Sequence, residues 1–386
     1  MATNNKYDIA IVDAGLAGLS LSILLAREGY EVLVLEKEKF PFHRVCGEYI
    51  SFESWNFLEE LGVPLSDWNL PAIKELLVSA PGGNFVEHSL PLGGFGISRH
   101  KLDDYLAGLA TQAGVLLLEE TKADDIRFAN GHFFIAGSAA GKQNIPFGAE
   151  ASVAVGAFGK RSNIDLKWER RFAQKKPNKL NNYIAVKYHV RSNQPPNQIA
   201  LHNFESGYCG FSRIEDEKYC LCYLTTAEIL GRCNNSVHQM EAIVLQRNPH
   251  LKKIFTESEF LFESPLTIAQ ISFDKKELVE NHVLMVGDAA GMITPLCGNG
   301  MSMALHASKI AFEKINAFLQ GNIDRVEMES TYRHHWSRLF ERRLQTGRLV
   351  QTFFGKKWLT NTFIQSLKPF PGLVDKLIRK THGAPF

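Results

Sequence analysis

Two glycines in a short turn near the start of the chain have the spacing of a phosphate-binding site. The apolar run 7–12 leads into the turn Asp13-Ala14-Gly15-Leu16-Ala17-Gly18, and a helical stretch follows. Gly15 would let the backbone approach a pyrophosphate, Gly18 would let the helix pack on the strand, and the helix N-terminus attracts anions. Glu36 ends the next apolar run, where it can bind ribose hydroxyls. This pattern predicts a dinucleotide site, and the alternative is an unliganded α/β turn.

A second glycine-rich loop follows the apolar run VLMV far downstream, as Gly287-Asp288-Ala289-Ala290-Gly291. Asp288, at the end of a strand, can hold a ribityl or ribose hydroxyl, and Pro295 stiffens the loop. Gly298 and Gly300 allow a close backbone approach. The helix that begins near Met301 would point its N-terminus at a bound ring and stabilise the anion of a reduced flavin. The alternative is a plain strand–loop–helix connection.

These turns need a particular set of elements to position them. The runs 7–12 and 31–35 read as strands buried on both faces, and the stretch between them reads as a helix that ends at Gly29. This is the βαβ unit of a dinucleotide-binding fold. Residues 182–225 alternate in character and predict an antiparallel sheet with one face covered, and 300–319 reads as a long helix.

Composition excludes several classes. The 386 residues are 45% apolar and 22% charged, which is ordinary for a globular protein. A net charge of +2 gives no reason to expect a nucleic-acid partner, and six cysteines without CxxC spacing indicate neither a disulfide scaffold nor a zinc site. No apolar run reaches eighteen residues, and the start does not read as a signal peptide, so we expect a cytoplasmic protein without a metal.

The pair of glycine-rich motifs resembles the FAD-dependent monooxygenase superfamily, whose members include p-hydroxybenzoate-hydroxylase-like enzymes, geranylgeranyl reductases and flavin-dependent halogenases. The segment FPFHRVCGEYIS (40–51) is similar to the reductase-type segment, in which a basic residue and Cys-Gly-Glu lie beside the flavin. The resemblance therefore implies that Arg44, Cys46, Gly47 and Glu48 lie near FAD. It also implies that Arg99 contacts the cofactor and that Asp288 holds the ribityl chain.

The chain departs from the family pattern at three places. Asp13 stands where the fingerprint has its first glycine, so a carboxylate lies close to the expected phosphates. In the middle motif, 156–162, Phe158 replaces the aspartate of the hydroxylases, which argues against direct NADPH reduction by their route. The Trp-x-Trp-x-Ile-Pro stretch of halogenases is absent, which disfavours halogenation.

The fold class predicted is α/β, with a Rossmann-type FAD-binding domain, an inserted antiparallel β-sheet substrate domain and C-terminal helices. The FAD-binding domain is expected to be discontinuous, over 1–75, 98–162 and 277–330, and the substrate domain is expected over 76–97 and 163–276. Residues 331–386 carry eleven Lys and Arg against only Glu341 and Asp375. They are predicted to form a basic helical cap.

FAD is the expected cofactor, and NAD(P)H or a separate reductase is the expected electron donor. No side chain is assigned as catalytic. The candidate cofactor-binding residues are Ala14, Gly15, Ala17, Gly18, Glu36, Lys37, Arg44, Cys46, Gly47, Arg99, Gly287, Asp288, Pro295, Gly298, Asn299, Gly300 and Met301.

Three functions follow from the resemblance and the departures. The first is a monooxygenase of secondary metabolism that hydroxylates a large apolar or aromatic substrate, free or carrier-bound, through a flavin C4a-hydroperoxide. The second is a reductase of carbon–carbon double bonds, like the geranylgeranyl reductases. The third is a scaffold without catalytic FAD, because of Asp13. The basic tail suggests contact with a membrane surface or an acidic protein as a secondary role.

Overall fold

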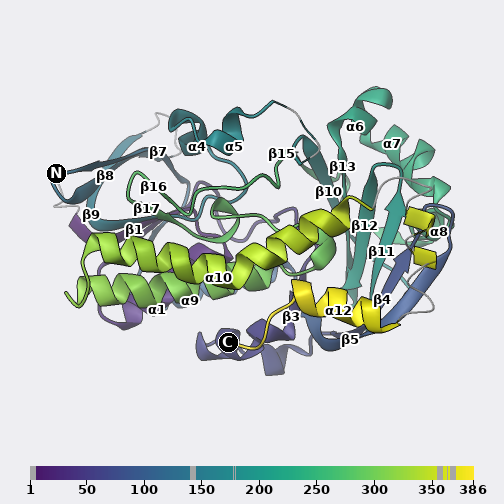
Figure 1. Ribbon diagram of the computed structural model, residues 1–386, viewed down its shortest axis with the longest axis horizontal. Coiled ribbons are helices and arrows are strands. Elements are labelled where there is room, and N and C mark those ends of the chain that lie inside the picture. Colours follow the sequence, from purple (N-terminus) through teal and green to yellow (C-terminus); the bar gives the residue numbers. More distant parts are fainter. Residues whose placement is uncertain are drawn as a thin grey trace.

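The computed structural model shows two sheets with helices packed around the first and at the far end of the second (Figure 1). The structure describes residues 6–139, 145–176, 178, 180–353, 360–362, 364–365 and 371–386. Lys356, Lys357 and Lys368 of the predicted basic cap lie outside the described residues.

The first sheet contains eight strands among the described residues, and its centre is parallel. The order along it is β16-β17-β9-β1-β2-β6, and β7 and β8 form a hairpin whose second strand pairs with β9. The central strands β1, β2 and β17 are short apolar runs that are largely buried, and α1 (Leu16–Arg27) packs against β1 and β2. Its strands are β1 (Lys6–Val12), β2 (Val32–Leu35), β6 (Leu116–Leu118), β7 (Thr121–Ala129), β8 (His132–Ala139), β9 (Ile145–Gly156), β16 (Val279–Glu280) and β17 (Val283–Met285).

The second sheet contains nine strands in the same part of the chain and is mostly antiparallel, as the alternation of 182–225 predicted. Its order is β14-β10-β13-β12-β11-β4-β5-β3, with β15 paired to β10. Its strands are β3 (Tyr49–Ser51), β4 (Ala72–Ser79), β5 (Phe85–Gly96), β10 (Tyr183–Arg191), β11 (Gln198–Phe204), β12 (Gly207–Arg213), β13 (Lys218–Thr226), β14 (Glu259–Phe260) and β15 (Leu266–Ile271).

Helices complete the two units. α1 (Leu16–Arg27), α3 (Arg99–Gln112) and α9 (Gly300–Leu319) belong to the first unit, and α10 (Arg325–Gln351) packs along α9. α12 (Pro371–Thr381) lies against α10 and β5. Other helices with bounds in the described part of the chain are α2 (Trp55–Glu60), α4 (Asn163–Lys167), α5 (Arg171–Gln174), α6 (Ala227–Arg232), α7 (Val237–Ile243) and α8 (Pro249–Glu257).

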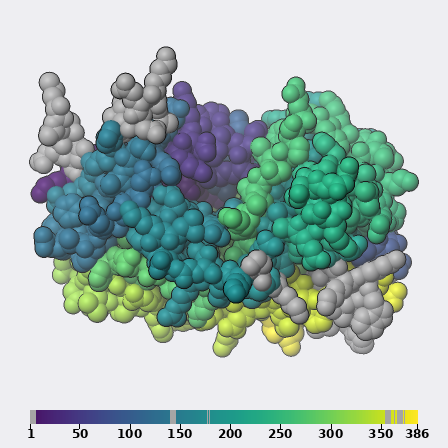
Figure 2. Space-filling view, turned by 90° about the horizontal axis from the view of Figure 1, so that it is seen from above, coloured from purple at the N-terminus to yellow at the C-terminus, as the bar shows by residue number. Residues whose placement is uncertain are grey.

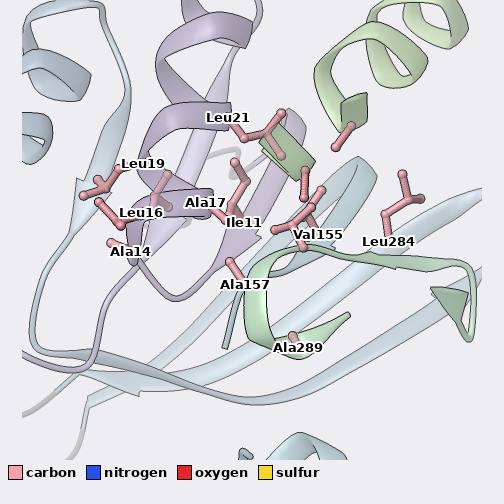
Figure 3. Close-up of a cluster of buried hydrophobic side chains, with 14 of the residues drawn as sticks. Ile11, Ala14, Leu16, Ala17, Leu19, Leu21, Val155, Ala157, Leu284 and Ala289 are labelled. Atoms are coloured by element: carbon pink, nitrogen blue, oxygen red, sulfur yellow. The ribbon is translucent and has the colours of Figure 1, made fainter. Parts of the chain in front are cut away.

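The core beneath α1 fixes the first motif to the second. Ile11 lies beside Ala17 of α1, and Val155 and Leu284 follow it across the neighbouring parallel strands, with Leu21 above them (Figure 3). All five are buried. Because β1 pairs with β9 and β9 pairs with β17, the loops that follow β1 and β17 leave the same edge of the sheet.

The domain boundaries stay predictions, and two strands of the segment assigned to the FAD-binding domain belong to the second sheet. β4 begins at Ala72, within the segment 1–75, and β3 of the same segment pairs with β5 of the second sheet. Among the described residues, no helix combines the length and apolarity that crossing a bilayer needs.

Gly18 sets the closeness of α1 to the first strand. A Cβ at this position would lie 2.3 Å from the carbonyl oxygen of Asp13 and 3.2 Å from the Cβ of Ala157. We expect Gly18→Ala to lower the free energy of unfolding by about 1–3 kcal/mol, because backbone must move to admit the methyl group. The measurement is urea unfolding of the two proteins.

Gly108 provides the matched control, since it lies inside α3 and a Cβ there would meet nothing within 4 Å. Gly108→Ala is expected to raise the free energy of unfolding by about 0.5–1 kcal/mol through helix propensity. Equal effects of the two substitutions would show that crowding at Gly18 does not matter.

Candidate functional site

The first turn presents the N-terminus of α1 to a cavity. Asp13 takes a left-handed backbone, φ 78°, which is the conformation that the missing first glycine would favour. Gly15 is the N-cap of α1 and has no side chain to cover the first N–H groups of the helix. Those groups and the positive end of the helix dipole are therefore available to an anionic ligand.

Arg44 neutralises the carboxylates that surround this turn. Its Nη2 atom lies 2.8 Å from Glu36 Oε2 and 3.4 Å from Asp13 Oδ1, and its Nε atom lies 3.2 Å from Asp103 Oδ2. Glu36 also accepts a hydrogen bond from the Ala14 amide at 3.1 Å. The turn that carries an aspartate in place of glycine thus has a guanidinium beside it.

The pKa values of the two carboxyls at the turn, Asp13 and Glu36, are shifted in opposite directions. Burial raises the pKa of Glu36 to about 8, and the neighbouring Asp13 charge adds to the effect. Burial also opposes ionisation of Asp13, but Arg44 and the hydrogen bond with Glu36 bring the pKa of Asp13 below its ordinary value. Of the two carboxyls, Glu36 is therefore the one that holds a proton more readily.

The second loop brings another helix N-terminus to the same place. Asp288 lies in a 3₁₀ turn, Gly287–Ala289, directly after β17, and burial raises the pKa of its carboxyl against the opposing effect of Lys276. Lys276 Nζ donates to the Asp288 carbonyl at 2.7 Å. Gly298 has φ 62°, and Asn299 is the N-cap of α9.

One cavity of about 900 Å³ lies between these motifs and the second sheet. Seen from above, purple N-terminal residues lie in a hollow between the blue-teal and green parts of the surface (Figure 2). Ala14, Gly18 and Glu36 do not line the cavity. The predicted residues that line it are Gly15, Ala17, Lys37, Arg44, Cys46, Gly47, Arg99, Gly287, Asp288, Pro295, Gly298, Asn299, Gly300 and Met301.

Glu36 was predicted to bind ribose, but it supports the phosphate turn and does not line the cavity. Its side chain is 0% exposed, and Oε1 accepts from the Glu38 amide at 3.0 Å while Oε2 accepts from Ala14 and Arg44. Through these hydrogen bonds Glu36 stabilises the turn and positions the Arg44 side chain. Arg44 and Lys37 line the cavity, and so do Asp13 and Glu38, so a ligand at this end would meet groups of both signs.

The cofactor side of the cavity fits FAD. Two helix N-termini, from α1 and α9, border one space, together with a cation at Arg44 and a carboxylate at Asp288. A Cβ on Gly47 would meet nothing within 4 Å, so this backbone borders open space that a flat ring can approach. These residues suit a ligand with phosphates at one end and a polyol and ring at the other.

The opposite wall is formed by the second sheet and is mostly apolar. Its polar side chains are Tyr208, which is 4% exposed, and Ser212, Tyr223, Thr267 and Gln270. Burial raises the pKa of Cys222 and of the Tyr208 hydroxyl well above their ordinary values, so both stay protonated at neutral pH. The lining residues from this side include Ala185, Ile199, Leu201, Tyr208, Phe211, Cys222, Leu224, Leu266, Ile268 and Ile271.

The sequence reasoning expected Glu48 near the cofactor but missed the buried residues that bind its carboxylate. Glu48 forms ion pairs with Lys187 and His189, and the donor atoms of Glu48, His189 and Cys220 lie within 4.8 Å of one another. The available signal was the interruption of an otherwise buried strand, 183–191, by a lysine and a histidine two residues apart. Cys220 is buried in the core, and Cys222, two residues further along the same strand, lines the cavity.

Comparisons with known proteins agree with this geometry. Residues 6–81 match the protein-family model described as FAD binding domain. Conditioned medium factor receptor 1 of Dictyostelium discoideum is 26% identical over 362 residues, which cover 86% of this chain and 68% of that protein. Digeranylgeranylglycerophospholipid reductase 2 of Methanothermobacter thermautotrophicus is 26% identical over 351 residues, covering 88% of this chain and 86% of the relative.

Solved structures share the fold along the whole chain. A flavoprotein/dehydrogenase from Cytophaga hutchinsonii has a TM-score of 0.79 at 18% identity and covers 97% of this chain and 92% of its own. The flavin-dependent brominase Bmp2 has a TM-score of 0.78 at 20% identity and covers 99% and 94%. The α/β fold class, the resemblance to FAD-dependent monooxygenases and reductases, and the prediction of an FAD-binding oxidoreductase are confirmed.

The proton on Glu36 makes a pH dependence testable. As pH rises through about 8, Glu36 loses its proton and places a second negative charge beside the phosphate turn. FAD affinity should therefore fall between pH 7 and pH 9, by at most about tenfold per pH unit for one proton. The measurement is fluorescence titration of the apoprotein with FAD across this range.

Glu36→Gln is the control for that titration, because it keeps the shape and removes the ionisation. Its FAD affinity should be flat over the same pH range. A slope that persists in Glu36→Gln would assign the pH dependence to another group.

Asp13→Gly tests whether the carboxylate in the turn opposes the cofactor. The left-handed backbone suits glycine, and removal of Asp13 removes the charge that helps to raise the pKa of Glu36. We expect FAD to bind several-fold more tightly to this variant near neutral pH, at roughly 1 kcal/mol. Weaker binding would show that the Asp13–Arg44 pair supports the turn more than it repels phosphate.

Proposed function

We propose that the chain is an FAD-dependent reductase of carbon–carbon double bonds in a large apolar substrate. The observation that carries the proposal is the single cavity with two unlike sides, an FAD-type side and an apolar sheet side. The name of the Methanothermobacter relative, a digeranylgeranylglycerophospholipid reductase, supports a substrate with long unsaturated chains.

Bound FAD, once reduced, supplies a hydride to one carbon of the double bond. The residues of this chain position the two partners and hold the proton that the other carbon needs. Burial raises the pKa of the Cys46 thiol, which lines the cavity, and the Tyr208 hydroxyl on the sheet side is likewise protonated. The wall thus carries two protonated groups that can complete the addition.

A monooxygenase is the second candidate. The same apolar wall excludes water, which favours an oxygenating flavin because it protects reactive intermediates from hydrolysis. An aromatic or polyketide-like substrate would suit this function, and an electron donor is needed in either case. Phe158 lines the cavity where the hydroxylases carry an aspartate, which argues against their route of direct NADPH reduction. A separate reductase is therefore proposed as electron donor beside NAD(P)H.

A scaffold without FAD is the weakest of the three proposals. It was suggested by the Asp13 carboxylate at the phosphate turn, but Arg44 Nη2 lies 3.4 Å from Asp13 Oδ1 and balances its charge. A purified protein that lacks flavin absorbance and gains none when incubated with FAD would still favour it.

The basic C-terminal helices support a secondary proposal of contact with an anionic surface, a membrane or an acidic protein. α10 packs on the loop that precedes α9, since Gly347 lies against Thr294 and Cys297. Their exposed cations are Arg333, Arg338, Arg342, Lys376, Arg379 and Lys380. A cytoplasmic location and the absence of a nucleic-acid partner remain expectations.

Anaerobic turnover separates the two catalytic candidates. Dithionite-reduced holoprotein is mixed without oxygen with a lipid that carries geranylgeranyl chains, and flavin reoxidation is followed by absorbance. A reductase should reoxidise with this lipid but not with its saturated counterpart. Reoxidation that requires oxygen, together with substrate-stimulated oxygen uptake, would contradict the reductase and favour the monooxygenase.

A further inference from the structure

Glu48 is a fully buried carboxylate in the loop between β2 and β3. Its Oε1 atom accepts from Lys187 Nζ at 2.5 Å and from the Arg99 amide at 2.8 Å, and its Oε2 atom lies 2.6 Å from His189 Nε2. Burial opposes ionisation, but Lys187 and His189 hold the pKa of Glu48 at about 2. The carboxylate can then only accept, so His189 donates through Nε2.

The same cluster binds the main chain of the loop. Lys187 Nζ also donates to the carbonyl of Arg44 at 3.0 Å, and the Cys220 thiol donates to the carbonyl of Cys46 at 3.2 Å. His189 and Cys220 are direct partners in the register of β10 with β13. The substrate sheet therefore holds this loop at two carbonyls and at the Glu48 side chain.

The other side of the loop is cavity wall. Arg44, Cys46, Gly47 and Glu48 itself line the cavity, and so does Arg99, whose amide donates to Glu48. The Arg99 guanidinium is held by Asp103 at 2.6 Å and 2.7 Å. Glu48 thus connects β10, the loop 44–48 and the start of α3, which are three parts of the enclosure around the proposed FAD site.

Glu48, His189 and Cys220 could also be taken for a metal site, since their donor atoms lie within 4.8 Å of one another. Two features argue against this. The Lys187 ammonium already occupies the space beside the carboxylate, and burial raises the pKa of the Cys220 thiol well above its ordinary value, so it is a poor ligand. The contacts are hydrogen bonds and an ion pair that attach the loop 44–48 to the second sheet.

We propose that Glu48 is a positioning residue that sets the loop 44–47 and Arg99 against bound FAD from the substrate sheet. The proposal rests on the FAD-binding function. A purely structural carboxylate would affect only stability, whereas a positioning one also affects how tightly FAD binds and how its ring is held. The distinction matters because both substrate and cofactor walls meet at this one side chain.

The test separates stability from cofactor binding. Glu48→Gln leaves Lys187 buried without its counter-ion, so the double variant Glu48→Gln/Lys187→Met is made as well. It removes both charges, and we expect its thermal midpoint to lie closer to that of the parent. FAD titration and visible circular dichroism of bound flavin are measured for each. We expect the double variant to bind FAD about tenfold more weakly, or worse, and to show an altered dichroism spectrum. Glu48→Asp should recover part of the loss.

Glu241→Gln is the matched control. Glu241 is another buried carboxylate of the second unit, held by the Tyr188 and Tyr223 hydroxyls at 2.9 Å and 2.7 Å, and it does not line the cavity. This substitution should lower the thermal midpoint and leave FAD affinity unchanged.

Two results would overturn the proposal. One is a stable double variant whose FAD affinity stays within about twofold of the parent, with an unchanged spectrum. The other is one equivalent of divalent metal in the purified holoprotein that is lost in Cys220→Ser. Failure of the parent protein to bind FAD would instead contradict the proposed function itself, which keeps the two outcomes distinct.

Discussion

The Arg44 guanidinium is the interaction on which the phosphate turn depends. Two carboxylates, Asp13 and Glu36, follow the ends of neighbouring parallel strands, and Asp103 comes from α3. Like charges this close and this buried repel strongly, and one proton and one arginine relieve them. The turn can therefore carry an aspartate at the first glycine position because a cation from a different segment compensates for it.

Arg44 also ties this turn to the rest of the enclosure. Its side chain reaches the first sheet, while its carbonyl is held by Lys187 of the second. The loop from 44 to 48 is therefore fixed at both ends, to the cofactor side by ion pairs and to the substrate side by Glu48. A change in either sheet would be felt at the backbone of Cys46 and Gly47, which border the space between them.

The sequence was sufficient to predict the two glycine motifs and their convergence, because both follow short apolar strands and parallel strands present their carboxyl ends at one edge. It also predicted the antiparallel sheet, since alternation over 182–225 is a strong local signal. What it could not predict are contacts set by tertiary packing. The pairing of Arg44 with Asp13, and the burial of Glu36 behind the turn, depend on the path of the loop after β2, which has no periodic pattern. Lys187 and His189 look like ordinary polar residues until the strand is placed beneath that loop.

The charges of the cavity are divided between its two sides, and this division has a physical consequence. The cofactor side has ion pairs and helix N-termini, which bind anions, while the sheet side offers the Cys222 thiol, the Tyr208 and Tyr223 phenols and aliphatic side chains that stay uncharged. An apolar substrate can enter the second side without leaving a buried charge unpaired. Glu48 lines the same cavity, and Lys187, His189 and the Arg99 amide bind its carboxylate oxygens. The arrangement lets a charged cofactor and an uncharged chain share one cavity, because the carboxylate that joins the two walls is paired by the substrate sheet and is not left alone to face an apolar substrate.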